Sequence, residues 1–135
     1  RLDNSGAGGP ITNRMIVSQL TTSAASANAI PTIMTMANDT TSFFEAKVAA
    51  RRTGGIAGSD GDSAGYVRRA IFQKIGAATA VAVGSIQDNF TVESQAAWDC
   101  TFVATGGDIA LRVTGATNND VFWSGEIFWM QAAIG

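Results

Sequence analysis

Residues 41–75 read TSFFEAKVAARRTGGIAGSDGDSAGYVRRAIFQKI, and this stretch decides the fold class. In residues 41–52 apolar and charged side chains alternate, which is the period-two pattern of a half-buried strand. Residues 65–75 repeat the alternation, and the Gly-, Ser- and Asp-rich segment between the two runs is typical of a loop. We therefore expect an antiparallel hairpin with a long tip, in a register that places Ala50 opposite Arg68.

This hairpin sorts its side chains onto two faces. One face carries the mainly apolar set Phe44, Ala46, Val48, Tyr66, Ala70 and Phe72, and the other carries Glu45, Lys47, Arg51, Arg69 and Gln73. A pair of strands with one apolar and one polar face is typical of an antiparallel sheet that covers a core on one side.

The rest of the chain continues the pattern. Short alternating apolar runs, bounded by turn signals, occupy residues 15–22, 30–37, 78–85, 90–94, 97–105, 108–115 and 121–131. The GGD turn after residue 105 predicts a tight hairpin. About nine short strands at this spacing predict an all-β fold, an antiparallel β-sandwich of jelly-roll-like type.

Length and composition limit the organisation and the chemistry. We expect a single domain at 15–135, preceded by an irregular lead-in at 1–14 from a longer parent chain, because the sequence begins at Arg1 without a signal-peptide pattern. Hydrophobic residues make up 46% and charged residues 15%, which excludes a disordered chain. The net charge of −2 gives no indication of the basic surface that binds nucleic acid. The chain has no run of about 18 apolar residues, so we expect no membrane insertion.

Histidine is absent and Cys100 is the single cysteine. Histidine-dependent nucleophiles, conventional zinc sites and an intrachain disulfide are therefore excluded. Two-carboxylate catalysis stays open among the eleven acids, but no pair stands out. We expect no enzyme and no cofactor. Cys100 lies between Trp98 and Phe102 in the alternation and is expected to be an inert buried thiol.

The last predicted strand, residues 121–131, carries large apolar side chains on both faces. Val121, Trp123, Ile127 and Trp129 share one face, and Phe122, Phe128 and Met130 share the other. Either this strand lies centrally beneath two layers, or the face with Phe122, Phe128 and Met130 is an oligomer interface.

The series VAARRTGG…DSAGYVRRAIF, AAWDCTF and LRVTGATNNDVFW resembles a module near the C-terminal ends of phage tail-fibre and tailspike proteins and related virion proteins. The resemblance covers about residues 45–130, where several short motifs of the module occur in the same order. It implies an all-β homotrimeric domain at the exposed end of a viral fibre, located on the extracellular virion, where host attachment or fibre trimerisation occurs. The first 40 residues match no motif of this module.

The loop TGGIAGSDGDSAG does not fit a phosphate cradle, because a P-loop needs its Lys and Ser or Thr before a helix and a strand follows here. Asp60 and Asp62 have a spacing found in calcium loops, but two acids fall short of the ligand number that calcium takes. We favour a solvated hairpin tip, in which Asp and Ser side chains bond to their own backbone.

The two arginine pairs flank this loop, and neighbouring strand residues point to opposite faces. Arg52 and Arg68 are expected to lean toward the core and to form an ion-pair network with Asp99 or the loop acids. The functional alternative is that outward Arg51 and Arg69, with Tyr66 available for stacking, bind an anionic host-surface glycan.

These observations lead to one functional hypothesis and two alternatives. We expect the distal domain of a viral tail fibre or spike, acting in trimer assembly and in attachment to a host-surface glycan or receptor. A carbohydrate-binding module of a larger depolymerase and a capsid decoration protein are the alternatives. A monomer with glycan affinity favours the first alternative, and a trimer that binds no surface favours the second.

Overall fold

The computed structural model describes residues 11–21, 27–29 and 32–133. Within these ranges the chain forms ten strands and no helix, and so no helix of the length and hydrophobicity needed to cross a bilayer. The strands are β1 (Ile11–Thr21), β2 (Ala27–Ala29), β3 (Met34–Thr35), β4 (Thr40–Gly54), β5 (Ser63–Lys74), β6 (Val81–Ala82), β7 (Gln87–Glu93), β8 (Asp99–Thr105), β9 (Asp108–Thr114) and β10 (Asp120–Ala133).

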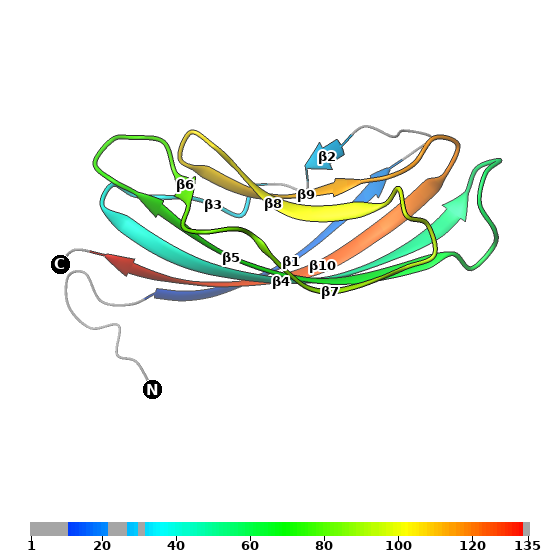
Figure 1. The fold of residues 1–135 in the computed structure, drawn as a ribbon, viewed down its shortest axis with the longest axis horizontal. Helices are drawn as coiled ribbons and strands as arrows, with labels where there is room; N and C mark the ends of the chain where they lie inside the picture. The colour runs from blue at the N-terminus through cyan, green and yellow to red at the C-terminus, as the bar shows by residue number, and fades with distance from the viewer. Residues whose placement is uncertain (1–10, 22–26, 30–31, 134–135) are drawn as a thin grey trace.

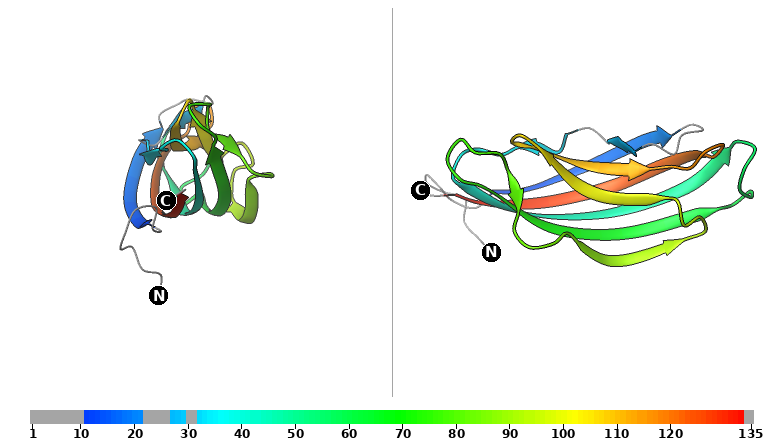
Figure 2. Two further views of the ribbon diagram at one scale, coloured as in Figure 1. Left: turned by 90° about the vertical axis from the view of Figure 1, so that its left-hand side faces the viewer. Right: turned by 45° about the horizontal axis from the view of Figure 1, so that its top comes forward.

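The strands form two antiparallel sheets that lie one over the other (Figures 1 and 2). The larger sheet has the order β1-β10-β4-β5, and β5 continues to β6 near one end and to β7 near the other. In the smaller sheet β9 is central, with β8 on one side and β2 and β3 on the other. The prediction of an all-β antiparallel sandwich is confirmed.

The hairpin of β4 and β5 has the predicted faces but a different register. Ala46, not Ala50, lies opposite Arg68, and Ala50 lies opposite Ala64. The prediction of Ala50 opposite Arg68 is therefore wrong by four residues. A shift by an even number of residues leaves every side chain on its predicted face, because side-chain direction repeats every second residue. Alternation alone cannot detect such a shift.

The core lies between the two sheets and is rich in aromatic side chains. Trp123 of β10 packs against Trp98 and stacks on Tyr66, and Phe44 contacts both Phe72 and Phe102. Burial of each large side chain contributes about 2 kcal/mol. The inner face of the smaller sheet adds Cys100, Phe102, Ile109, Leu111 and Val113, all buried.

β10 is a central strand of the larger sheet, between β1 and β4. Its inner face is buried through Val121, Trp123, Ile127 and Trp129, as predicted. On its outer face Phe122 and Met130 are 46% and 37% exposed, and Phe128 is partly buried. Of the two alternatives for this strand, burial beneath two layers is therefore not observed in the described part of the chain.

Several boundaries differ from the predicted ones. β1 begins at Ile11, inside the predicted lead-in, because residues 11–14 already pair with β10. β2 lies in a segment predicted as a connection. Among the described residues of the predicted strand 30–37, only Met34–Thr35 form a strand. The predictions for residues 1–10, 22–26 and 30–31 lie outside the described residues. The predicted tight hairpin is present, with Thr105 opposite Asp108 and Gly106 at φ 59°.

Candidate functional site

The side chain of Arg68, on β5, points into the core, and the residue is 4% exposed. Its Nε donates to the carbonyl oxygen of Cys100 on β8 at 2.7 Å, and its Nη1 donates to the carbonyl oxygen of Phe90 on β7 at 2.8 Å. Asp88 lies 2.6 Å from Nη1 and Asp99 3.6 Å from Nη2. One side chain of β5 thus holds a strand from each sheet.

The two carboxylates that pair with the buried Arg68 guanidinium are themselves largely exposed to solvent. The side chains of Asp88 and Asp99 are 63% and 62% exposed. The guanidinium carbon also lies 4.8 Å from the ring centre of Tyr66, a cation–π contact. Arg68 and Asp99 therefore form the ion pair expected from the sequence. Arg52 is not part of the same cluster.

Arg52 instead fastens the loop between β4 and β5. Its Nε and Nη2 donate to the carbonyl oxygens of Ala57 and Gly55, and its Nη1 lies 2.8 Å from the carboxylate of Asp60. Its side chain is 9% exposed, whereas that of Asp60 is fully exposed. The guanidinium fills the inside of the loop, which gives the loop a fixed shape.

The second loop acid, Asp62, also bonds to protein donors. Its carboxylate accepts from the amide of Ser59 at 2.8 Å and from the side chain of Gln95 at 2.7 Å. These two hydrogen bonds, the Ser59 amide first, lower the pKa of Asp62 below its usual range. Among the described residues no three potential metal ligands cluster. Asp60 and Asp62 instead hold the loop in place through their contacts with Arg52, Ser59 and Gln95.

The three residues predicted to bind a ligand do not come together. Arg51 is exposed on the outer face beside the loop. Arg69 lies on the same face, where its Nε donates to Glu45 at 2.7 Å. Tyr66 lies on the inner face at 2% exposure, stacked on Trp123. The prediction that Tyr66 is available for ligand stacking is therefore corrected, because its ring is enclosed by the core.

Burial also determines the ionisation of Tyr66 and Cys100. Burial, followed by the hydrogen bond that the hydroxyl donates to Glu93 at 2.7 Å, raises the pKa of Tyr66 far above its usual value. Burial raises the pKa of the Cys100 thiol to about 12, although the nearby Arg68 opposes this. Both groups are therefore uncharged at neutral pH.

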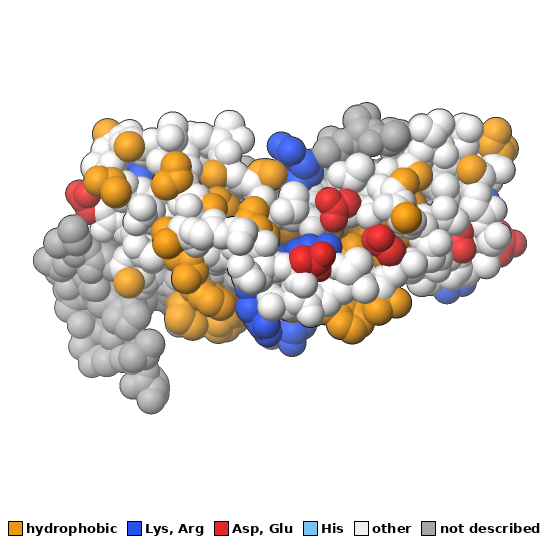
Figure 3. All heavy atoms as spheres, viewed as in Figure 1, with side chains coloured by type: hydrophobic (Ala, Val, Ile, Leu, Met, Phe, Trp, Pro, Cys, Tyr) orange, Lys and Arg blue, Asp and Glu red, His pale blue; other side chains and the backbone are white. Residues whose placement is uncertain are grey.

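The outer face of the larger sheet is apolar at many positions. Figure 3 shows hydrophobic side chains along the lower margin of the molecule, over this sheet, on both sides of a group of Lys and Arg. Seven large apolar side chains on this face are between 36% and 71% exposed: Ile16, Leu20, Ile71, Phe90, Val92, Phe122 and Met130. A surface of this kind typically marks an interaction site.

Charged side chains cross the middle of this outer face. Arg14 of β1 pairs with Glu126 of β10 at 2.5 Å, and Arg69 of β5 pairs with Glu45 of β4. Lys47 lies between them, opposite Glu126 in the strand register. The charges alternate in sign across the sheet, so this band is nearly neutral and separates two apolar regions.

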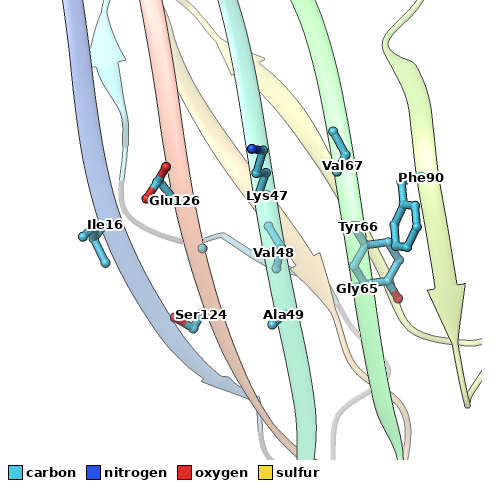
Figure 4. Close-up of a pocket in the computed structure, with 11 residues that line it drawn as sticks. Ile16, Lys47, Val48, Ala49, Gly65, Tyr66, Val67, Phe90, Ser124 and Glu126 are labelled. Carbon is cyan, nitrogen blue, oxygen red and sulfur yellow. The ribbon is translucent and has the colours of Figure 1, made fainter.

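A trough of about 430 Å³ opens on the outer face beside the charged band. Its floor is made by small residues that lie in register on three strands, Ser124, Ala49 and Gly65. Figure 4 shows Ile16 on β1 at one side of the trough and Phe90 on β7 at the other. The trough is therefore lined mainly by apolar groups and backbone, with polar contacts at its charged end.

The residues at the two sides of this surface were not expected from the sequence. Ile16 and Leu20 on β1, and Phe90 and Val92 on β7, were not predicted as surface residues of interest. The signal was present in Ile16, Ser18 and Leu20, which alternate with Met15, Val17 and Gln19. Apolar side chains on both phases of one strand are the same pattern that singled out residues 121–131.

No protein-family model and no curated protein matches the chain. Among solved structures, the fold is similar to the tailspike protein of Acinetobacter baumannii phage AM24, with a TM-score of 0.49 and 11% identity. That similarity covers 91% of this chain but only 26% of the tailspike chain. A second similarity is to the disulfide-linked pili of Bacillus endospore appendages, with a TM-score of 0.29, 15% identity and coverage of 100% and 99%. Similarities this remote carry no argument about function.

Proposed function

We propose that this chain is a non-catalytic domain of a phage tail fibre or tailspike, which forms a homotrimer and attaches the virion to a host-surface glycan. The sequence resemblance over residues 45–130 supports the class of protein. The observation that carries the trimer is the outer face of the larger sheet, where Phe122 and Met130 on central strand β10 remain exposed. Exposed apolar groups in the middle of a sheet are covered in a stable assembly.

The positions of the two chain ends and of the loop between β4 and β5, at opposite ends of the sandwich, support a role at a fibre tip. The start of β1 and the end of β10 lie at one end of the sandwich, because Ile11 pairs with Gln131. The loop between β4 and β5 projects from the opposite end (Figure 1). Any chain joined before β1 therefore leaves the loop end free to face a host surface.

The loop end also carries the groups for glycan contact. Arg52 fixes the loop shape from inside, Ile56 is 90% exposed at the tip, and Arg51 is exposed at its base. A preformed loop loses little conformational freedom on binding, and an exposed guanidinium offers several donors to hydroxyl or carboxylate groups.

The test combines an oligomer measurement with a binding measurement. Residues 1–135 are applied to an array of bacterial surface polysaccharides, and their mass is measured by light scattering. We expect a trimer that binds at least one polysaccharide and loses most of this binding in Arg51→Ala. Arg112→Ala is the matched control, since Arg112 is an exposed arginine on β9 of the smaller sheet, away from both the loop and the outer face of the larger sheet.

Each other outcome changes the conclusion. A monomer that binds the array indicates a carbohydrate-binding module. A trimer that binds neither the array nor whole bacteria indicates a structural role such as capsid decoration. Release of sugar from an arrayed polysaccharide by residues 1–135 would overturn the non-catalytic assignment.

A further inference from the structure

We propose that a pocket between β5 and the connection from β6 to β7 binds one neutral sugar ring, at a site separate from the loop between β4 and β5. The inference rests on the proposed glycan attachment for the source of the sugar, and it does not depend on the trimer. β5 lies two strands from β10, whose exposed Phe122 and Met130 carry the proposed trimer.

The pocket exists because two short strands follow one another along the same edge of β5. β6 pairs with residues 72–73 of β5, and β7 begins opposite Arg69. The segment 83–86 joins β6 to β7, and it is held beside β5 by the amide of Val83, which donates to the carbonyl oxygen of Ile71 at 2.8 Å. A cavity of about 210 Å³ lies between this segment and the outer face of the sheet.

The lining of the pocket is mainly apolar, with a few polar side chains. Phe43 and Ile71 lie opposite each other on β4 and β5, and Val83 adds an apolar group from the connecting segment. The polar side chains of the lining are Arg69, Ser85 and Gln87. This combination is typical of sites for small ligands. The volume is below the roughly 300–1,000 Å³ of sites for drug-sized molecules, so the pocket suits a single ring.

The charge of Arg69 is compensated by Glu45. The Nε of Arg69 donates to the carboxylate of Glu45 at 2.7 Å, and the two side chains are 43% and 25% exposed. This bond uses one of the five N–H donors of the guanidinium, so the four on its two Nη atoms can donate to a ligand. Because the pair is neutral overall, it attracts neither an anion nor a cation strongly. A neutral ligand therefore fits better than the anionic glycan expected for Arg69 from the sequence.

Sugar hydroxyl groups match the polar side chains of this pocket. The guanidinium of Arg69 only donates, whereas a hydroxyl such as that of Ser85 both donates and accepts. The Nε2 of Gln87 already donates to the carbonyl oxygen of Ser85 at 2.9 Å, which leaves its Oε1 as an acceptor. A pyranose carries adjacent hydroxyl groups that donate and accept, and it has an apolar C–H face that can pack on Phe43. No other single chemical group uses both parts of this lining.

The experiment titrates residues 1–135, labelled with ¹⁵N, with the methyl glycosides of glucose, galactose and mannose, and follows the amide signals by NMR. We expect at least one of the three sugars to shift the amide signals of Gly84 and Ser85 and the Nε signal of Arg69. We expect glucuronate, which adds a carboxylate, to bind no more tightly than methyl glucoside. Tighter binding of glucuronate, or no shift with any of the three sugars, overturns the inference.

Arg69→Met tests the role of the guanidinium. Loss of one hydrogen bond from a charged donor is expected to weaken the binding of the sugar by at least about tenfold. Arg14→Met is the matched control, because Arg14 forms the same kind of pair with Glu126 on the outer face but does not line this pocket. Equal weakening in the two variants would show that the pocket is not the site.

The polysaccharide array separates this inference from the proposed function. Array binding that is lost in Arg51→Ala and unchanged in Arg69→Met, without sugar-induced shifts at Gly84 and Ser85, overturns the inference while the glycan attachment stands. Sugar-induced shifts in a chain that binds no polysaccharide and no bacterium support the pocket and reject the attachment.

Discussion

Arg68→Met tests whether the buried guanidinium joins the two sheets. The substitution keeps most of the aliphatic side chain and removes every hydrogen bond of the head group. The carbonyl oxygens of Cys100 and Phe90 lose charged donors at 2.7 and 2.8 Å. At about 1.5 kcal/mol for each such bond, their loss costs about 3 kcal/mol.

The carboxylates of Asp88 and Asp99 add little to this cost. Because both are more than half exposed, each remains solvated when its partner is removed, and surface pairs of this kind contribute less than about 1 kcal/mol. The full penalty of about 3–5 kcal/mol for breaking a buried pair therefore does not apply. We expect the free energy of unfolding to fall by about 3 kcal/mol in total.

The assay is urea unfolding followed by tryptophan fluorescence, at one protein concentration for all variants. All three tryptophans are buried, so unfolding changes their environment strongly. Arg69→Met is the matched control: the same substitution, one residue along the chain, at a side chain 43% exposed and paired with Glu45 on the outer face. Its expected cost is less than about 1 kcal/mol. Equal losses in the two variants would refute the assignment of Arg68 as the link between the sheets.

Three further predictions concern titratable groups. Burial raises the pKa of Cys100 to about 12, so at about pH 8 roughly one thiol in ten thousand is a thiolate. We therefore expect a maleimide to label the native chain far more slowly than the urea-unfolded chain. Equal labelling rates would contradict the burial of this thiol. Tyr66 is the single tyrosine, and burial raises its pKa. We therefore expect no tyrosinate absorbance in the native chain at about pH 10, where an exposed tyrosine is half ionised. Half-ionisation of Tyr66 at that pH would show that its ring is accessible to solvent. The pKa of Asp62 is lowered by folding, so its stabilising contribution is complete above its unfolded-state pKa and is lost as the pH falls through the lower folded-state pKa. NMR titration of this carboxyl is expected to give a midpoint below 3.8, and Gln95→Ala is expected to move it partway back, because the Ser59 amide remains; an unchanged midpoint would exclude a role for Gln95.

The face of each strand in the central hairpin was predictable, because alternation fixes which side chains share a side. The register was not. Pairing Ala50 with Arg68 or with Ala64 leaves the same faces buried, and the choice depends on the loop, where Arg52 binds carbonyl groups that have no sequence signature. β2 was missed because its residues, Ala27–Ala29, are too small to produce a pattern.

The site was predictable in parts. The outward direction of Phe122 and Met130 followed from alternation in residues 121–131, since a single strand with two apolar faces is unusual. The pair of Arg68 with Asp99 was expected from the sequence, but the contact of Arg68 with Asp88 was not, because it depends on the pairing of β5 with β7, which residue spacing does not encode. The trough depends on small residues of three strands falling on one line, and this requires the register.

The mass of residues 1–135 in solution tests the central claim, that the outer face of the larger sheet is covered by further copies of the chain. Light scattering over a series of protein concentrations measures it directly. The proposed homotrimer has a mass of about 42 kDa, three times the 13.9 kDa of one chain. A monomer near 13.9 kDa at every concentration would contradict the account, because the exposed apolar residues of β1, β7 and β10 would then face water.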